Sequence, residues 1–207
     1  MEEWECFADS WDRLPRDTFM GDGGQYRYRR HAIYAAASGD AAQIMPPGPH
    51  FQSRAYNALN GGIERWFERI EPQVANGKLL TALLSVSGAV FGKRRPGVNW
   101  HIEVHQFRIV AEKGRVGCPT PEGVHRDGVD FVMVMMIRRR NIASGHTELF
   151  APDGSLVSGF TLVEPRAAVV LDDHRLAHGV TPVIPVEPDT PSYRDVLVIT
   201  YREKTAR

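Results

Sequence analysis

The sequence predicts a mainly β protein, in which a sandwich or barrel core stands behind a helical N-terminal support. From Asn99 onward, short apolar and alternating segments are separated by turn signals, and no helical pattern alternates with them to build a parallel sheet. Before about residue 96 the pattern is mixed and includes two segments with helical spacing of apolar residues. We therefore expect residues 1–207 to form a single domain, with about 1–98 as the support and about 99–207 as the core.

The N-terminal half begins with an aromatic and basic stretch at residues 25–34, followed by a Pro/Gly loop. Two helical patterns come next. The first covers residues 58–70, although a Gly-Gly pair weakens its start. The second runs from Lys78 to Val90 with a broad apolar face. Its apolar run, at residues 79–91, is shorter than the roughly 20 residues that span a bilayer, so we expect a buried helix.

Strand patterns fill the C-terminal half. The two longest cover residues 100–110 and 123–137, and the second contains the apolar run Phe131–Ile137. Turn signals such as Pro152-Asp-Gly154 separate the later patterns. These shorter strands are expected at residues 147–150, 156–163, 167–171, 177–183 and 196–201.

Charge and composition exclude several classes of partner. Lys plus Arg number 25 and Asp plus Glu number 25, and this balance argues against nucleic acid and against an anionic membrane surface. The opening residues MEEWECF are acidic where a signal peptide is basic, and two cysteines are too few for a disulfide framework. We expect a cytoplasmic protein whose partner is a small-molecule substrate, with no nucleic acid, no membrane, and a homodimer as the candidate assembly.

The segment GVHRDG at residues 123–128 is the most informative about chemistry. His125 and Asp127 are two residues apart, so on a strand they would share one face at about 6.6 Å and could bind one ion. His178 lies on a later strand pattern. Two imidazoles and one carboxylate leave coordination positions open, as in non-haem Fe(II) oxygenases. Arg194 opens the last strand pattern, where a guanidinium could form a bidentate pair with a carboxylate inside the core.

The sequence resembles the small bacterial 2-oxoglutarate/Fe(II)-dependent dioxygenases that hydroxylate free amino acids, of the L-isoleucine dioxygenase type. Weaker similarity at residues 17–27 and 52–53 extends the resemblance over most of the chain. The specific part lies in the C-terminal half, at Pro121–Phe131, Arg140–Ile142, Leu171–Asp173, His178–Pro182 and Arg194–Val196.

This resemblance implies a double-stranded β-helix, or jelly roll, with Fe(II) bound by His125, Asp127 and His178. It also implies that Arg194 binds the distal carboxylate of the co-substrate 2-oxoglutarate. The expected reaction consumes O2, releases succinate and CO2, and oxidises an aliphatic C–H bond of a free amino acid or close derivative, with hydroxylation as the simplest outcome. Two alternatives stay open: the same chemistry on a peptide or tethered biosynthetic intermediate, and a non-catalytic jelly-roll protein that binds a small molecule.

A competing metal cluster is formed by His101, Glu103 and His105, which share one face of the expected strand. A zinc site there would need a fourth ligand or an open water position. Three ligands from one strand rarely converge on one ion, so a polar face of the sheet is the favoured interpretation. Gln106 and Arg108 then lie on the opposite face, and Gln106 is our candidate for a second contact to the co-substrate.

The other charged side chains near these motifs have less specific interpretations. The run Arg138–Arg140 is expected at a solvated hairpin end, with one arginine as a candidate for binding a substrate carboxylate. Arg27 and Arg29 have the same status. Asp172 and His174 share strand parity with His178 and are candidates for holding that ligand, because metal-bound imidazoles usually donate a second hydrogen bond.

Overall fold

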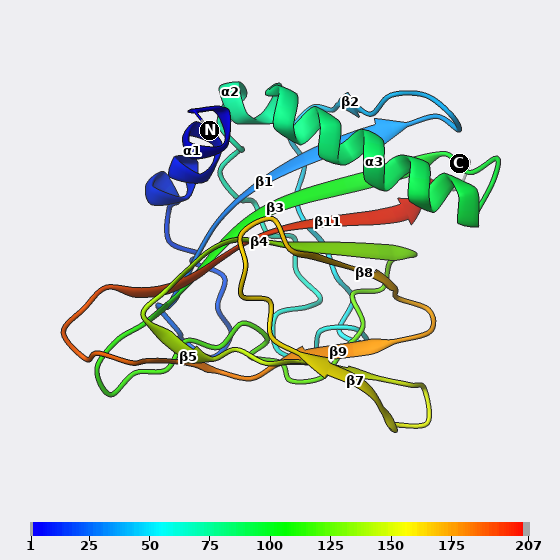
Figure 1. Ribbon diagram of the computed structural model, residues 1–207. Helices are drawn as coiled ribbons and strands as arrows, with labels where there is room; N and C mark the ends of the chain where they lie inside the picture. The colour runs from blue at the N-terminus through cyan, green and yellow to red at the C-terminus, as the bar shows by residue number, and fades with distance from the viewer. Residues whose placement is uncertain (1, 205–207) are drawn as a thin grey trace.

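The computed structural model describes residues 2–204 and contains one large and two small antiparallel sheets. Figure 1 shows the large sheet between the helices on one side and the small sheets on the other. The large sheet has the order β2-β1-β3-β11-β4-β8: Gln43–Ile44, Arg27–Ala36, Trp100–Ala111, Ser192–Glu203, Phe131–Arg140 and Ala168–Asp172. The small sheets pair β10 with β5 (Val183–Pro185, Ile142–Ser144) and order β7-β6-β9 (Leu156–Phe160, Thr147–Phe150, Ala177–Val180). The facing sheets confirm the predicted sandwich.

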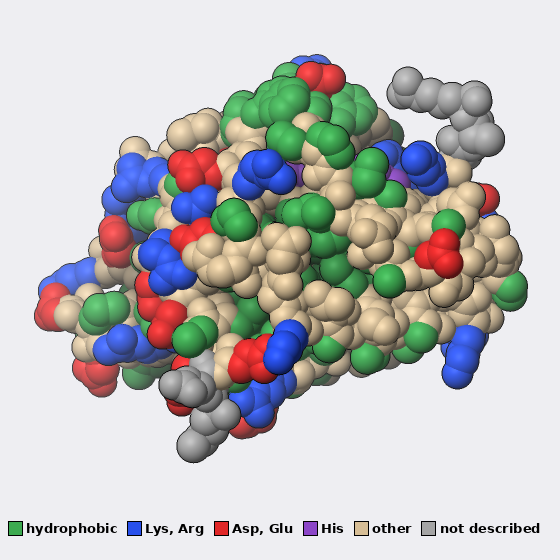
Figure 2. All heavy atoms as spheres, turned by 90° about the horizontal axis from the view of Figure 1, so that it is seen from above, with side chains coloured by type: hydrophobic (Ala, Val, Ile, Leu, Met, Phe, Trp, Pro, Cys, Tyr) green, Lys and Arg blue, Asp and Glu red, His purple; other side chains and the backbone are tan. Residues whose placement is uncertain are grey.

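The helices cover the outer face of the large sheet: α1 (Glu2–Asp9), the 3-10 turn η1 (Ser10–Arg13), α2 (Pro72–Ala75) and α3 (Lys78–Arg94). Seen from the helix side, Figure 2 shows Lys, Arg, Asp and Glu gathered toward the N-terminal end, with few charged side chains over the middle. Within residues 2–204, no helix has the length and apolar character needed to cross a bilayer.

Side chains of the central strands point alternately toward the helices and toward the opposite face of the sheet. In β3, Trp100, Ile102 and Val104 are buried toward the helices and belong to the main core. The residues between them face the opposite side, into a cavity between the sheets. In β11 the same division places Leu197, Ile199 and Tyr201 in the core. The core therefore stabilises the large sheet from its helix face, while the inner face is free to carry polar side chains.

Most strand predictions in the C-terminal half are confirmed, with two local differences. The pattern expected at residues 123–137 yields a strand only from Phe131, because residues 123–130 form a loop in which Gly123 and Gly128 have positive φ. At Gly128 a side chain would also collide with the ring of Tyr56. The pattern at residues 177–183 divides into β9 and β10.

The N-terminal half differs more from expectation. The helix predicted at residues 78–90 is confirmed as α3, although its outer face is exposed rather than buried. The helix predicted at residues 58–70 is wrong, since this segment is a turn and a bend, in which Gly62 has a φ of +82°, followed by irregular backbone with isolated bridges at Arg65 and Arg69. Its apolar periodicity does not mark a core face, because Ile63 and Trp66 are exposed. The aromatic and basic stretch forms β1, which pairs with β3 over ten residues.

Phe91 of α3 should be one of the largest single contributors to the stability of this packing. Its ring stacks on Phe131 at 4.6 Å and meets Tyr201 edge-on at 4.8 Å, with 1% of the residue exposed. We expect Phe91→Ala to lower the free energy of unfolding by about 3–5 kcal/mol, because it leaves a cavity at this contact. Val90→Ala, at a neighbouring position that is 45% exposed, is the matched control and should change it by less than about 0.5 kcal/mol. Equal losses in urea denaturation would contradict the packing role of Phe91.

Candidate active site

A cavity of about 280 Å³ lies between the sheets and holds the most informative residues of the sequence. Its walls come from the inner face of the large sheet, from β6 and β9, and from the loops at residues 50–57 and 119–129. One part is apolar, lined by valines and leucines of β4, β8 and β11. The rest is polar, and its side chains fall into three groups.

The loop that carries His125 and Asp127 is fixed by two sets of backbone hydrogen bonds. The N–H of His125 donates to the carbonyl of His178 at 2.9 Å, and the reciprocal bond measures 2.8 Å. The carboxylate of Asp173 accepts hydrogen bonds from the N–H groups of Asp127, Gly128 and Val129, at 2.9, 2.8 and 3.1 Å. A single β-bridge and the carboxylate of Asp173 thus hold the loop, so that both side chains lie in the cavity.

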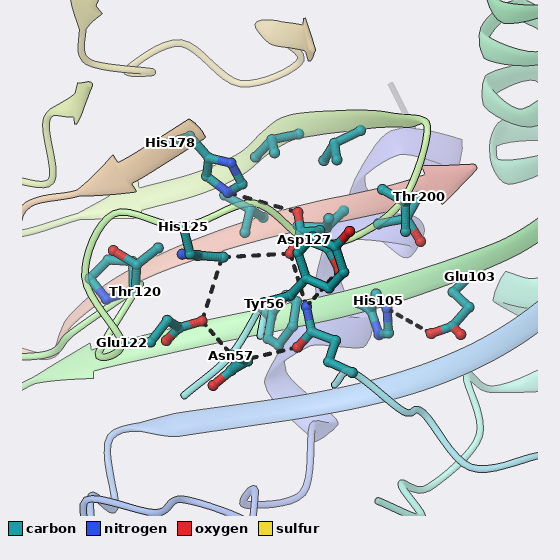
Figure 3. Close-up of a pocket in the computed structure, with 18 of the residues that line it drawn as sticks. Tyr56, Asn57, Glu103, His105, Thr120, Glu122, His125, Asp127, His178 and Thr200 are labelled. Carbon is teal, nitrogen blue, oxygen red and sulfur yellow. Dashed lines mark hydrogen bonds and ion pairs between the residues drawn. The ribbon is translucent and has the colours of Figure 1, made fainter. Parts of the chain in front are cut away.

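The first polar group contains His125, Asp127 and His178, whose ligand atoms all lie within 4.8 Å of one another. Figure 3 shows the three side chains pointing toward a common point. Nε2 of His125 is 3.6 Å from Oδ1 of Asp127, and Nε2 of His178 is 3.8 Å from Oδ2. These separations are too long for strong hydrogen bonds but suit ligands around one ion. The structure thus brings together the three residues that the sequence singled out.

The hydrogen bonds of His125 prepare it to bind a metal ion. Its Nδ1–H donates to the carbonyl of Gly123 at 3.0 Å, which leaves the lone pair of Nε2 directed at the centre of the group. Burial lowers the pKa of His125, but the carboxylates of Asp127 and Glu122 outweigh it and raise the pKa to about 9. Burial also raises the pKa of Asp127, but His125 and His178 outweigh it and hold that pKa below its usual value. The metal-free site is therefore a charged pair, and a bound cation would displace a proton from His125.

The second polar group lies at Arg194, which is buried at the start of β11. Among the described residues, its Nε has no hydrogen-bond partner. Arg139 lies close enough to act on it electrostatically, and burial together with that charge lowers the pKa of Arg194 to about 10. A buried guanidinium on the cavity wall with an N–H that has no partner in the described chain favours an anionic ligand.

A family model for 2OG-Fe dioxygenases matches residues 8–200. The chain belongs to the 2OG-Fe dioxygenase family. This confirms the resemblance found in the sequence, and members of the family use Fe(II), 2-oxoglutarate and O2. The grouping of His125, Asp127 and His178 fits that iron, because it offers two imidazoles and one carboxylate and leaves further coordination positions open.

Three relatives illustrate the range of the similarity. A bsmA homologue from Methylobium petroleophilum PM1 is 40% identical, with a TM-score of 0.89 over 100% of this chain and 83% of that one. IDO from Bacillus thuringiensis shares the fold at 21% identity, with a TM-score of 0.82 over 99% and 87% of the two chains. The 3(1)-hydroxy-L-isoleucine 4-dioxygenase of Pantoea ananatis is 27% identical over 164 residues. That alignment covers 76% of this chain, and 66% of the Pantoea protein, just under two thirds of its length.

Gln106 is predicted to contact the co-substrate, but the structure places its side chain outside the cavity. It is fully buried and donates to Oγ of Ser10 at 2.8 Å, on the helix side of the large sheet. It does not line the cavity, and its neighbour Arg108 is bound bidentately by Asp195 at 2.7 Å. The prediction that Gln106 contacts the co-substrate is therefore contradicted, because strand alternation places it on the opposite face from His105.

The third polar group gathers around Glu103 and differs from the cluster expected in the sequence. His31 of β1 and His50 join His105 about this carboxylate, whereas His101 contacts only its other oxygen. Burial raises the pKa of Glu103, but the four imidazoles outweigh it and hold that pKa well below its usual range.

The hydrogen bonds at His105 argue against a second metal site in this group. Arg29 donates to Nδ1 of His105 at 2.8 Å, so the neutral ring carries its proton on Nε2, which lies 3.4 Å from Glu103. Burial keeps the pKa of His105 well below its usual value, so the ring is neutral. With Nε2 protonated, His105 has no lone pair for a metal ion there. The group is best described as an ionised carboxylate held by imidazole donors.

Several residues of the site were not singled out in the sequence. Asp173 holds the ligand loop, whereas Asp172 and His174 do not contact His178: the side chain of Asp172 accepts from the N–H of His174, whose ring binds Asp130. Arg65 and Glu122 also line the cavity. A single charged residue outside a motif cannot be identified as a cavity residue from the sequence, since only the tertiary fold directs its side chain inward. Arg138 pairs with Asp9 and Asp12 rather than facing the cavity.

Removing charge from Asp173 should loosen the ligand loop without unfolding the protein. An amide offers one acceptor oxygen where the carboxylate has two, so Asp173→Asn cannot accept all three N–H groups equally. We expect metal affinity to fall roughly 10- to 100-fold, as for other groups that orient metal ligands. Asp172→Asn is the matched control, because its side chain does not touch the loop. Titration of both variants with Mn(II) checks this prediction. Equal Mn(II) affinities of the two variants would contradict the positioning role of Asp173.

Proposed function

We propose that the protein is an Fe(II)/2-oxoglutarate-dependent dioxygenase that oxidises an aliphatic C–H bond of a free amino acid or close derivative, releasing succinate and CO2. The observation that carries this proposal is the convergence of His125, Asp127 and His178 in a cavity that also contains Arg194. The 3(1)-hydroxy-L-isoleucine 4-dioxygenase among the relatives supports the substrate class. The complete set of groups argues against a non-catalytic binding protein. A homodimer and a cytoplasmic location stay predictions from the sequence.

In this proposal each part of the cavity has a separate task. His125, Asp127 and His178 hold Fe(II), which when bound supplies the redox chemistry with O2 and 2-oxoglutarate. Arg194 binds the distal carboxylate of the co-substrate, and the apolar part of the lining excludes water from its hydrocarbon chain. The hydrogen bond from His125 to Gly123 keeps the imidazole in the tautomer that binds metal through Nε2. Substrate binds in the polar part of the cavity.

Succinate release from 2-oxoglutarate in the presence of Fe(II), O2 and each of the twenty amino acids tests this function. We expect at least one amino acid to stimulate release and to gain one oxygen atom in the mass of its product. His178→Ala should lower the rate by more than roughly 100-fold, since even groups that only orient ligands contribute 10- to 100-fold. His174→Ala, an exposed imidazole outside the cavity, is the control. Undiminished succinate release from His178→Ala would refute the assignment.

A further inference from the structure

Buried polar atoms that lack a partner indicate what the cavity binds besides iron and 2-oxoglutarate. Within residues 2–204, such atoms at the cavity include Nη2 of Arg27, Nε of Arg29, Nε of Arg65 and Oε2 of Glu122. A buried charged group without its full set of hydrogen bonds is costly, so these atoms are expected to bind a ligand or water. Three are donors on cations and one is an acceptor on an anion.

The three arginines form a buried cationic cluster in which only Arg27 and Arg29 have a carboxylate of the described residues within 4 Å. Arg27, Arg29 and Arg65 are 5%, 3% and 2% exposed. Asp17 lies 2.7 Å from Arg27 and 3.8 Å from Arg29. Arg65 forms no ion pair among the described residues and donates only to the amide oxygen of Gln52, at 3.0 Å. Burial and the charge of Arg27 both lower the pKa of Arg65.

Arg29 is also held rigidly. Its guanidinium lies between the rings of Phe67 and Phe107, 3.7 and 4.4 Å from their centroids. Stacking on both faces leaves only the edge of the group for hydrogen bonding. On that edge Nη2 donates to His105, and Nε is the N–H without a partner among the described residues, so it could donate to an anion such as a carboxylate.

Glu122 supplies the opposite charge at the iron end of the cavity. Its Oε1 accepts from Asn57 at 3.1 Å and lies 3.5 Å from Nε2 of His125. Its Oε2 is buried without a donor among residues 2–204. Figure 3 shows Glu122 and Asn57 side by side below the three ligand residues. A cationic donor from a ligand would satisfy this oxygen.

One chain of side-chain amides links the two charges. Oε1 of Gln52 accepts from Arg65 at 3.0 Å and from Asn57 at 3.2 Å, and Asn57 continues to Glu122. Nε2 of Gln52 lies 3.3 Å from Oδ1 of Asp127. The chain thus fixes a cation and a carboxylate relative to each other and beside a metal ligand.

We infer that the cavity binds its substrate as a free zwitterion, an α-amino acid whose carboxylate is bound by Arg65 and its neighbours and whose ammonium group is bound by Oε2 of Glu122. This inference rests on the proposed function and narrows it. A peptide-linked or carrier-tethered residue has its carboxylate in an amide or thioester and would leave Arg65 without an anion. The cavity therefore selects a free amino acid over either alternative.

Equilibrium binding measurements distinguish the contact of Arg65 with the carboxylate from the contact of Glu122 with the ammonium group. The probes are the twenty L-amino acids, titrated calorimetrically into anaerobic protein loaded with Fe(II) and 2-oxoglutarate, then the amide and the des-amino acid of the tightest binder. We expect the amino acid to bind roughly 30-fold or more tightly than either analogue, as for loss of one partner of a buried charged pair. Arg65→Gln should weaken binding of the amino acid but not binding of its amide. Glu122→Gln should weaken binding of the amino acid but not binding of its des-amino analogue.

Arg69→Gln and Glu64→Gln, which are exposed in the same segment as Arg65, are matched controls and should bind as the unsubstituted protein does. The visible charge-transfer band of Fe(II) with 2-oxoglutarate reports that each variant is folded and loaded. If the band forms but no amino acid binds, or the amide binds as tightly as the amino acid, the zwitterion site is refuted while the iron assignment stands. If the band does not form in the unsubstituted protein, the proposed function itself fails. Equal weakening of amino acid and amide by Arg65→Gln would also overturn the inference.

Discussion

Three backbone N–H groups in the loop at residues 127–129 converge on the buried carboxylate of Asp173, and the geometry of the site depends on this contact. The loop has no strand partner except the single bridge between His125 and His178. That bridge sets the distance between the two imidazoles, and Asp173 sets where Asp127 lies against them. A metal site built on a loop needs such anchors, because its ligands must be held to a fraction of an ångström.

Strand alternation lets one sheet serve both the core and the chemistry. The outer face of β3 and β11 packs against α3 and the N-terminal helix, which stabilises the sheet without using any polar group of the cavity. The inner face then holds Glu103, His105 and Arg194, whose burial is compensated by hydrogen bonds or by the ligands they bind. The sequence has equal numbers of basic and acidic residues. Function does not need a net charge, because it depends on a few buried charged side chains, and the charge of the surface is free to vary.

Features with strong local patterns could be predicted from the sequence. The long strands, α3 and the grouping of His125, Asp127 and His178 all followed from periodicity, spacing or motif. The false helix at residues 58–70 arose because apolar residues with helical spacing can be exposed, and a glycine with positive φ breaks the pattern. The role of Asp173 rather than Asp172 could not be predicted, since adjacent acids differ only in which one the turn directs inward. The roles of Arg65 and Glu122 could not be predicted either, because they depend on contacts with residues distant in sequence.

We propose that iron lies among His125, Asp127 and His178 and not at the second group of imidazoles around Glu103. Anomalous diffraction at the iron absorption edge, from anaerobic crystals grown with Fe(II) and 2-oxoglutarate, tests it most directly. We expect one strong anomalous peak between the two imidazoles and Asp127, and electron density for the distal carboxylate of 2-oxoglutarate at Arg194. A peak beside Glu103, with none at Asp127, would contradict it.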